Sequence, residues 1–247
     1  MSSRISLWTG LIGVSATIAF AQRPLYGIVQ PVIAKTPVQV GEIARAITVL
    51  ISEPNSQGSG VIIQRQGDTY TVLTTRSVVR QKADYKITTP DDRQYQIVSG
   101  SLRVAPGDID LAVVKFKSTT NYATAKLGNS NSLKSGMALY LAGFSAPSTA
   151  ITQSIFGLTS GAVIANSNKI FRNGYSLISN ITRPGMAGGA VLNNDGELVA
   201  IHGQGDSLSE RLRQRDSDGN KTGFNLGIPI DRFITIANAM GVKLDKK

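Results

Sequence analysis

Short apolar and β-branched runs, separated by turn-forming residues, recur along the chain from residue 47 onward. Residues 60–64 and 69–74 flank Gln66-Gly67-Asp68, an arrangement that predicts a β-hairpin. Residues 111–116 form a continuous apolar run, which is typical of a buried strand. The pattern predicts roughly a dozen short strands in all. The others are expected at 47–51, 85–88, 95–98, 138–143, 154–159, 162–165, 176–178, 190–192, 198–201 and 224–228.

Turn and helix signals complete this pattern. Asn173-Gly174 and Asp195-Gly196 predict tight hairpins, because these residues tolerate a left-handed backbone. Residues 41–46 predict a short helical turn before the first strand. Residues 230–240 carry apolar side chains at helical spacing and precede Gly241, which predicts a C-terminal helix. Together these elements predict an all-β fold, either two small barrels or a sandwich, with one terminal helix.

The first residues have the pattern of a signal peptide. Arg4 precedes the apolar stretch 5–20, and Ala19-Phe20-Ala21 at its end is an A-x-A cleavage signal. We therefore expect cleavage after Ala21 and export to the periplasm or the medium. An uncleaved membrane anchor is the alternative, but the apolar stretch is shorter than the roughly 20 residues that a membrane span needs.

Composition and charge limit the classes of function. The chain has no cysteine, which excludes thiol catalysis, disulfide bonds and cysteine-based metal sites. The formal net charge is +10, but Lys and Arg are scattered without a dense block, so we expect no nucleic-acid binding. An anionic surface or glycan stays open as a partner. The segment that begins at residues 216–220 faintly resembles a calcium loop but has no glycine at the sixth position and no glutamate at the twelfth, so no metal is predicted.

Three segments carry the candidate chemistry, and they occur in a fixed order. The first is GSGVI at 58–62 with VLTTRSVV at 72–79, the second is DIDLAVV at 108–114, and the third is PGMAGGAVL at 184–192. They resemble the histidine, aspartate and serine elements of trypsin-like serine proteases of the chymotrypsin/HtrA kind. The resemblance extends over residues 41–240.

The resemblance implies two six-stranded antiparallel β-barrels with a C-terminal helix and a cleft between the barrels. The expected organisation is therefore a signal peptide at 1–21, an extended proline-containing arm at 22–40, and a trypsin-like peptidase domain at 41–247. Within that domain we expect the N-barrel at about 41–125, the C-barrel at about 126–229 and the helix at about 230–241.

The resemblance carries the catalytic roles onto Ser77, Asp110 and Ala187. The family's histidine falls on Ser77 and its nucleophile on Ala187, while the aspartate is retained as Asp110. A register shift of one residue would place Arg76 at the histidine position instead. A methyl group cannot attack a carbonyl, and neither a hydroxyl nor a guanidinium serves as a base near neutral pH. The resemblance thus implies a degenerate triad, with Asp110 retained for its hydrogen bonds.

Other family positions fall on backbone groups and on one histidine. The N–H groups of Gly185 and Ala187 correspond to the oxyanion hole, which needs no side chain. It either persists as a carbonyl- or carboxylate-binding nest, or the glycines serve only the turn. The specificity-pocket wall falls on His202, Gly203, Gln204 and Gly205. For His202, the only histidine of the chain, we expect a structural role in or near the core.

The sequence therefore predicts an exported trypsin-like serine protease homologue that is an inactive pseudoprotease. It is expected to bind or scaffold an unidentified protein or peptide, without a cofactor. One alternative is an active serine endopeptidase seen as an inactivated variant, with Ala187 as the engineered change. Ser77 argues against this, because one substitution would have sufficed. The other alternative is a basic surface protein that binds polyanions.

Overall fold

The structure is a computed structural model that describes residues 34–81, 83–166, 176–207 and 221–244. Residues 1–33 and 34–247 form separate units, and the description below concerns the second unit. The predicted signal peptide, the arm up to residue 33, the Asn173-Gly174 turn and the loop 216–220 lie outside the described residues. No helix within the described ranges is long and apolar enough to cross a membrane.

The chain enters the fold through helix α1 (Pro37–Ile47), which is longer than the predicted turn at 41–46. It begins within the range predicted for the extended arm, 22–40, so that the arm's predicted end is wrong. The reason is local, because Thr36 and Gln39 form a reciprocal capping box and Pro37 occupies the first turn, where proline is favourable. The helix buries one apolar stripe, formed by Val40, Ala44 and Ile47.

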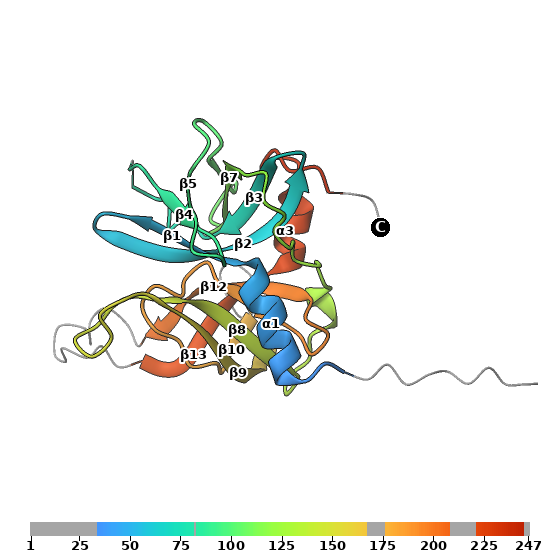
Figure 1. Ribbon diagram of the computed structural model, residues 1–247. Coiled ribbons are helices and arrows are strands. Elements are labelled where there is room, and N and C mark those ends of the chain that lie inside the picture. The colour runs from blue at the N-terminus through green and yellow to red at the C-terminus, as the bar shows by residue number, and fades with distance from the viewer. Residues whose placement is uncertain (1–33, 82, 167–175, 208–220, 245–247) are drawn as a thin grey trace, which may run out of the picture. The chain divides into compact units, whose positions relative to one another are not determined.

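Seven strands form an antiparallel sheet in the order β5-β4-β1-β2-β3-β7-β6, here called the N-terminal sheet (Figure 1). The chain after β5 returns to the other side of the sheet, where the Val98 N–H donates to the Lys115 carbonyl of β7 at 2.8 Å, so the sheet curls on itself. The seventh strand is the two-residue β6 at the sheet's edge. The strands are β1 (Thr48–Glu53), β2 (Ser56–Gln66), β3 (Thr69–Thr74), β4 (Lys86–Thr88), β5 (Gln94–Gln96), β6 (Arg103–Val104) and β7 (Ala112–Lys117).

The second half of the chain forms a closed six-stranded barrel in the order β10-β13-β12-β11-β8-β9, here called the C-terminal barrel (Figure 1). The two strands predicted at 154–159 and 162–165 are one continuous strand, because the β8–β9 ladder is unbroken from Ala138↔Ala162 to Ser145↔Ile155. The strands are β8 (Ala138–Ser145), β9 (Ile155–Asn166), β10 (Ser176–Ile178), β11 (Ala190–Leu192), β12 (Leu198–Ser207) and β13 (Lys221–Pro229).

Helix α3 (Ile230–Ile236) follows β13 and is shorter than the predicted 230–241. Beyond it the backbone continues as turns, with the Met240 N–H bonded to the Ala237 carbonyl at 3.0 Å. Phe233, Ala237 and Met240 nevertheless pack into the core, which explains why the apolar spacing extended further than the helix. A short 3₁₀ turn, η1 (Ser130–Ser132), lies beside the start of α3, where Asp231 accepts hydrogen bonds from Ser130.

One apolar cluster joins the two β units. It contains Leu73 and Val113 of the N-terminal sheet together with Ala142 and Ile201 of the C-terminal barrel, and both helices pack against it. Each β unit also has an apolar cluster of its own. Because the shared cluster fixes the two units to each other, loops from both are held at their junction. The predicted arrangement of two curled antiparallel β units with a small C-terminal helix is confirmed.

Candidate functional site

Ser77 and Asp110 lie on the loops that follow β3 and precede β7, and they are in direct contact. The two strands pair as far as Thr74↔Ala112, which brings the loops together. The Ser77 N–H donates to Asp110 Oδ1 at 2.9 Å, and the Ser77 hydroxyl donates to Oδ2 at 3.0 Å. The Thr75 hydroxyl lies 2.9 Å from that of Ser77. Serine thus ties the carboxylate to the turn with two hydrogen bonds.

The neighbouring Arg76 holds the loop that carries Asp110. Its guanidinium donates to the carbonyl oxygens of Ala105, Gly107 and Ile109. All three bonds come from the same guanidinium nitrogen, Nη2, and they tie the backbone before β7 to the turn after β3. Ser77, and not Arg76, is therefore the residue that contacts the Asp110 carboxylate. The sequence motif suggests Arg76 only as an alternative for the histidine position and gives no sign of these contacts to the loop before β7.

The third motif forms a tight turn, residues 184–189, in which glycine is required by contact as well as by conformation. Gly185 and Gly188 have positive φ values of 92° and 83°. A Cβ atom on Gly188 would lie 2.1 Å from the Ser59 carbonyl oxygen, and one on Gly189 would lie 2.1 Å from that of Ala142. Neither position accepts a side chain, so the glycine pattern has a full structural explanation.

Ser59 connects this turn to the N-terminal sheet. It is fully buried on β2, and its N–H donates to the Ala187 carbonyl at 2.7 Å. Its hydroxyl donates to the Gly185 carbonyl at 3.0 Å and accepts from the Phe144 N–H at 2.8 Å. Ser59 was not predicted as a site residue, although its place between Gly58 and Gly60 in the first motif was a signal.

Ala187 is half-buried in the turn and packs against the apolar cluster of the N-terminal sheet, to which Val78 also belongs. The backbone N–H groups of Gly185 and Ala187 donate to no acceptor among the described residues. The structure therefore brings Ala187 to the same junction of the two β units as the Ser77 turn.

His202 lies on β12 behind the glycine turn. Its N–H donates to the Gly189 carbonyl at 2.9 Å, and its carbonyl accepts from the Gly188 N–H at 2.8 Å. Burial lowers the pKa of the imidazole to about 4, while a hydrogen bond with the Leu226 backbone opposes this shift. The imidazole is therefore neutral near pH 7, and its Nδ1 has no hydrogen-bond partner within the described part of the chain.

The remaining positions of the predicted specificity pocket follow His202 on the same strand. Gly203 is buried, and Gly205 pairs with Asn225 of β13 after a register shift. The side chain of Gln204 lies outside the described residues. Across the described ranges, no three acidic or histidine side chains are grouped so as to hold a metal ion.

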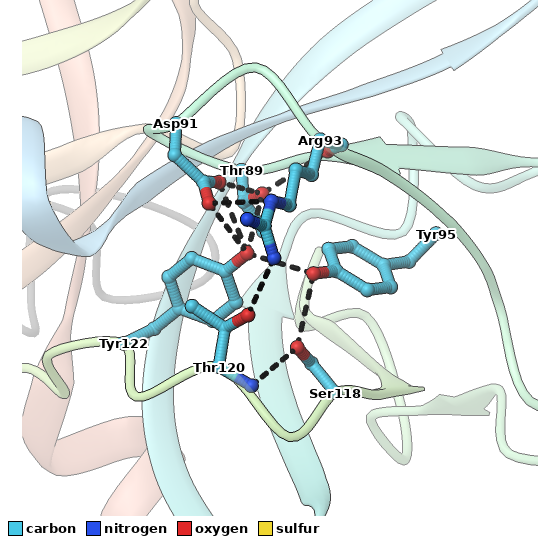
Figure 2. A network of polar contacts seen from close by, with 7 residues as sticks. All are labelled: Thr89, Asp91, Arg93, Tyr95, Ser118, Thr120 and Tyr122. Atoms are coloured by element: carbon cyan, nitrogen blue, oxygen red, sulfur yellow. Dashed lines mark hydrogen bonds and ion pairs between the residues drawn. The ribbon is translucent and has the colours of Figure 1, made fainter.

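A second polar cluster, which the sequence analysis did not predict, lies in the N-terminal sheet away from these motifs (Figure 2). The Tyr122 hydroxyl donates to the Asp91 carboxylate at 3.0 Å and lies 2.8 Å from the Tyr95 hydroxyl. Burial raises the pKa of Tyr122 to about 12. The cluster braces the turn after β4 against the chain after β7. Its members are Thr89, Asp91, Arg93, Tyr95, Ser118, Thr120 and Tyr122.

Comparison with known proteins agrees with the fold and the motif order. The family profile of the trypsin-like peptidase domain matches residues 58–201, from the first motif to β12. Two curled β units with loops from both at their junction define a protein of the trypsin-like class. The chain belongs to the trypsin-like peptidase domain family.

The chain is also similar to bacterial proteins named serine protease HtrA-like. It is 28% identical over 208 residues to one from Staphylococcus haemolyticus, covering 80% of this chain and 29% of that protein. It is 29% identical over 153 residues to one from Staphylococcus aureus, covering 58% of this chain and 19% of that protein. The chain thus spans less than a third of the length of these relatives.

Proposed function

We propose that this chain is an exported, catalytically inactive trypsin-like protein that binds a protein or peptide at the junction of its two β units. The observation that carries the proposal is the direct contact of Ser77 with Asp110. Family resemblance puts a histidine at the position of Ser77, so the carboxylate is bonded to a hydroxyl where an imidazole would stand. The same resemblance puts the nucleophile at Ala187.

The chemistry of acyl transfer supports this proposal. Attack on a carbonyl needs a nucleophile and a base that titrates near neutral pH. His202 is the only histidine in the chain, and it is buried on β12 with its N–H and carbonyl bonded to the glycine turn. In a well-studied serine protease, loss of the nucleophile or of the histidine alone lowers turnover about 10⁶-fold. Both are replaced in the proposed assignment.

Export rests on the sequence pattern of the first 21 residues, which have the charge, apolar stretch and cleavage signal of a signal peptide. The name of the relatives, serine protease, favours a second candidate function, an active serine endopeptidase. That function would require a nucleophile and a base other than those of the family.

Activity-based labelling of the purified full chain tests the proposal. We expect no labelling by a fluorophosphonate probe and no turnover of casein or of a peptide library, with an active trypsin-like protease as the positive control. Labelling of the chain, or turnover that scales with its concentration after contaminating proteases are removed, would overturn the proposal and favour the endopeptidase.

A further inference from the structure

A surface cavity at one end of the N-terminal sheet is lined by side chains that all carry a polar group. Its volume is about 420 Å³. It is bordered by Asp68 of the β2–β3 turn, by Arg93 and Tyr95 at β5, and by residues 117–120 at the end of β7 and after it. The cavity therefore brings together three segments that are distant in the sequence.

This cavity is separate from the motifs of the family. The ladder of β3 and β7 begins beside the cavity at Thr69↔Lys117 and ends at Thr74↔Ala112, next to the turn that carries Ser77. Five residue steps along an antiparallel strand span about 17 Å. A ligand in the cavity would therefore leave the junction of the two β units unoccupied.

The polar cluster of Figure 2 holds the wall of the cavity in one arrangement. The Arg93 guanidinium contacts the Asp91 carboxylate through Nε at 3.3 Å and donates through Nη1 to the Thr120 hydroxyl at 2.9 Å. The Ser118 hydroxyl donates to that of Tyr95 at 2.9 Å and accepts from the Thr120 N–H at 3.1 Å. Side chains that are ordered before a ligand arrives lose little conformational entropy when it binds.

Other lining groups stay open to a ligand. The hydroxyl of the exposed Thr119 has no hydrogen-bond partner in the described part of the chain. The Lys117 ammonium lies 3.8 Å from the Asp68 carboxylate, and both side chains are more than half exposed. An exposed ion pair contributes little to stability, so both groups can exchange it for contacts with a ligand. The cavity thus presents a strong donor, a strong acceptor and a hydroxyl group beside one another.

From these observations we propose that the cavity binds a saccharide unit through its hydroxyl groups. An anion would be attracted by Arg93 and Lys117 but repelled by Asp68, and a cation would meet the reverse. An apolar ligand would displace water from polar groups without replacing its hydrogen bonds, which is costly. A hydroxyl group both donates and accepts, so a sugar can use all of the lining groups. The volume is also within the range of small-molecule sites.

The partner is therefore a glycan that does not need a charge, in contrast to the polyanion that the net charge of +10 favours. Binding of the full chain to a glycan array tests this. The array carries neutral, anionic and amine-bearing glycans and is washed with about 1 M NaCl, which screens charges beyond about 3 Å. We expect binding to a set of neutral glycans that survives the wash. Binding confined to anionic glycans, or no binding to any neutral glycan, would overturn the inference.

Asp68→Asn separates a saccharide from an anion by the direction of its effect. Removing the charged acceptor should weaken the binding of a selected neutral glycan about fivefold, whereas an anion would bind more tightly because its repulsion is relieved. Asparagine is a favourable turn residue, so the hairpin should be retained. Asp195→Asn, at an exposed turn of the C-terminal barrel, is the matched control and should leave the affinity unchanged. Unchanged or increased affinity in Asp68→Asn would contradict the saccharide site.

Thr119→Val supplies a second variant, which leaves the charge of the cavity unchanged. It replaces an exposed hydroxyl by a methyl group and should weaken the same glycan about fivefold. Thr124→Val, at an exposed position outside the cavity, is the control. Circular dichroism melts establish that each variant is folded. Equal affinities for Thr119→Val and the unmodified chain would overturn the assignment of the glycan to this cavity.

Discussion

The hydroxyl of Ser77 donates to the carboxylate of Asp110 across 3.0 Å, and the Ser77 N–H holds the other oxygen of the same carboxylate at 2.9 Å. In a working triad an imidazole stands between the carboxylate and the nucleophile. It takes the proton of the nucleophile and later gives it to the leaving amine, while the carboxylate orients the ring and stays ionised. The direct serine–aspartate contact keeps the loops in place without such a carrier. In this chain, therefore, the contact that stabilises the junction is separate from the imidazole that proton transfer would need.

This separation predicts that catalysis can be restored by two changes together. Ser77→His combined with Ala187→Ser should produce fluorophosphonate labelling and peptide hydrolysis. Either single change should leave both at the level of the unmodified chain, because the members of a triad act as a unit and one missing member already costs about 10⁶-fold in turnover. A single variant as active as the double variant would contradict the assignment of Ser77 and Ala187.

Arg76→Lys should destabilise the fold although it preserves the charge. All three bonds to the carbonyl oxygens of the loop before β7 come from the same nitrogen, Nη2, which lies one bond further from the backbone than the ammonium of lysine, so lysine should reach fewer of these oxygens. We expect a loss of about 1–2 kcal/mol in the free energy of unfolding. Urea unfolding measures it, with Arg80→Lys at an exposed position as the control. Equal midpoints for the two variants would show that Arg76 does not brace the loop.

The fold class was predictable because its signals are local. Alternating apolar residues and hairpin dipeptides such as Asp195-Gly196 depend on a few neighbours, and most strands lie where the pattern placed them. Boundaries were less predictable. A capping box at Thr36 moved the start of α1, and Ser160 and Gly161 did not interrupt β9 because the β8 ladder continues through both residues.

The candidate site was predictable only where a family motif exists. Ser77, Asp110 and Ala187 were found through motif order, and their roles stay predictions. Ser59 escaped detection because its partner Gly185 is 126 residues away in the sequence. Long-range contacts of this kind follow from the packing of the two β units and leave no periodic signal in the chain.

Gly188→Ala should be among the most damaging small substitutions in the glycine turn. The added Cβ would lie 2.1 Å from the Ser59 carbonyl oxygen at a residue whose φ is 83°. The strained backbone and the overpacking together should cost about 2–4 kcal/mol of unfolding free energy. Gly136→Ala has the same kind of φ in open space and should cost only about 1 kcal/mol. Similar denaturation midpoints for Gly188→Ala and Gly136→Ala would show that a Cβ atom at position 188 does not collide with the Ser59 carbonyl.

Tyr122→Phe tests the polar cluster of the N-terminal sheet. The variant loses the hydroxyl that donates to Asp91 and lies beside that of Tyr95, and we expect a loss of about 1–2 kcal/mol in unfolding free energy. Tyr140→Phe is the control, because the Tyr140 hydroxyl makes no hydrogen bond within the described residues and its loss should cost less free energy of unfolding than that of Tyr122. Alkaline absorbance titration should also show a phenol ionising near pH 12 that is absent from Tyr122→Phe.

His202 makes the stability of the fold depend on pH in a defined window. Burial holds the pKa of its imidazole at about 4 in the folded state, against 6.5 as the ordinary value. Between these values the unfolded chain binds a proton that the folded chain excludes. The contribution of His202 to stability is therefore complete above about pH 6.5 and falls as the pH decreases toward about 4. Below about pH 4 this group causes no further loss, because both the folded and the unfolded chain then bind the proton.

The size and origin of this effect can be measured directly. The shift corresponds to a loss of about 3 kcal/mol, and urea unfolding at pH 7 and pH 4 should show it in the unmodified chain but not in His202→Gln. Because His202 is the only histidine, its imidazole resonances can be followed by NMR without ambiguity. An imidazole that titrates near pH 6.5 in the folded protein would mean that water reaches the ring and that His202 does not make stability depend on pH.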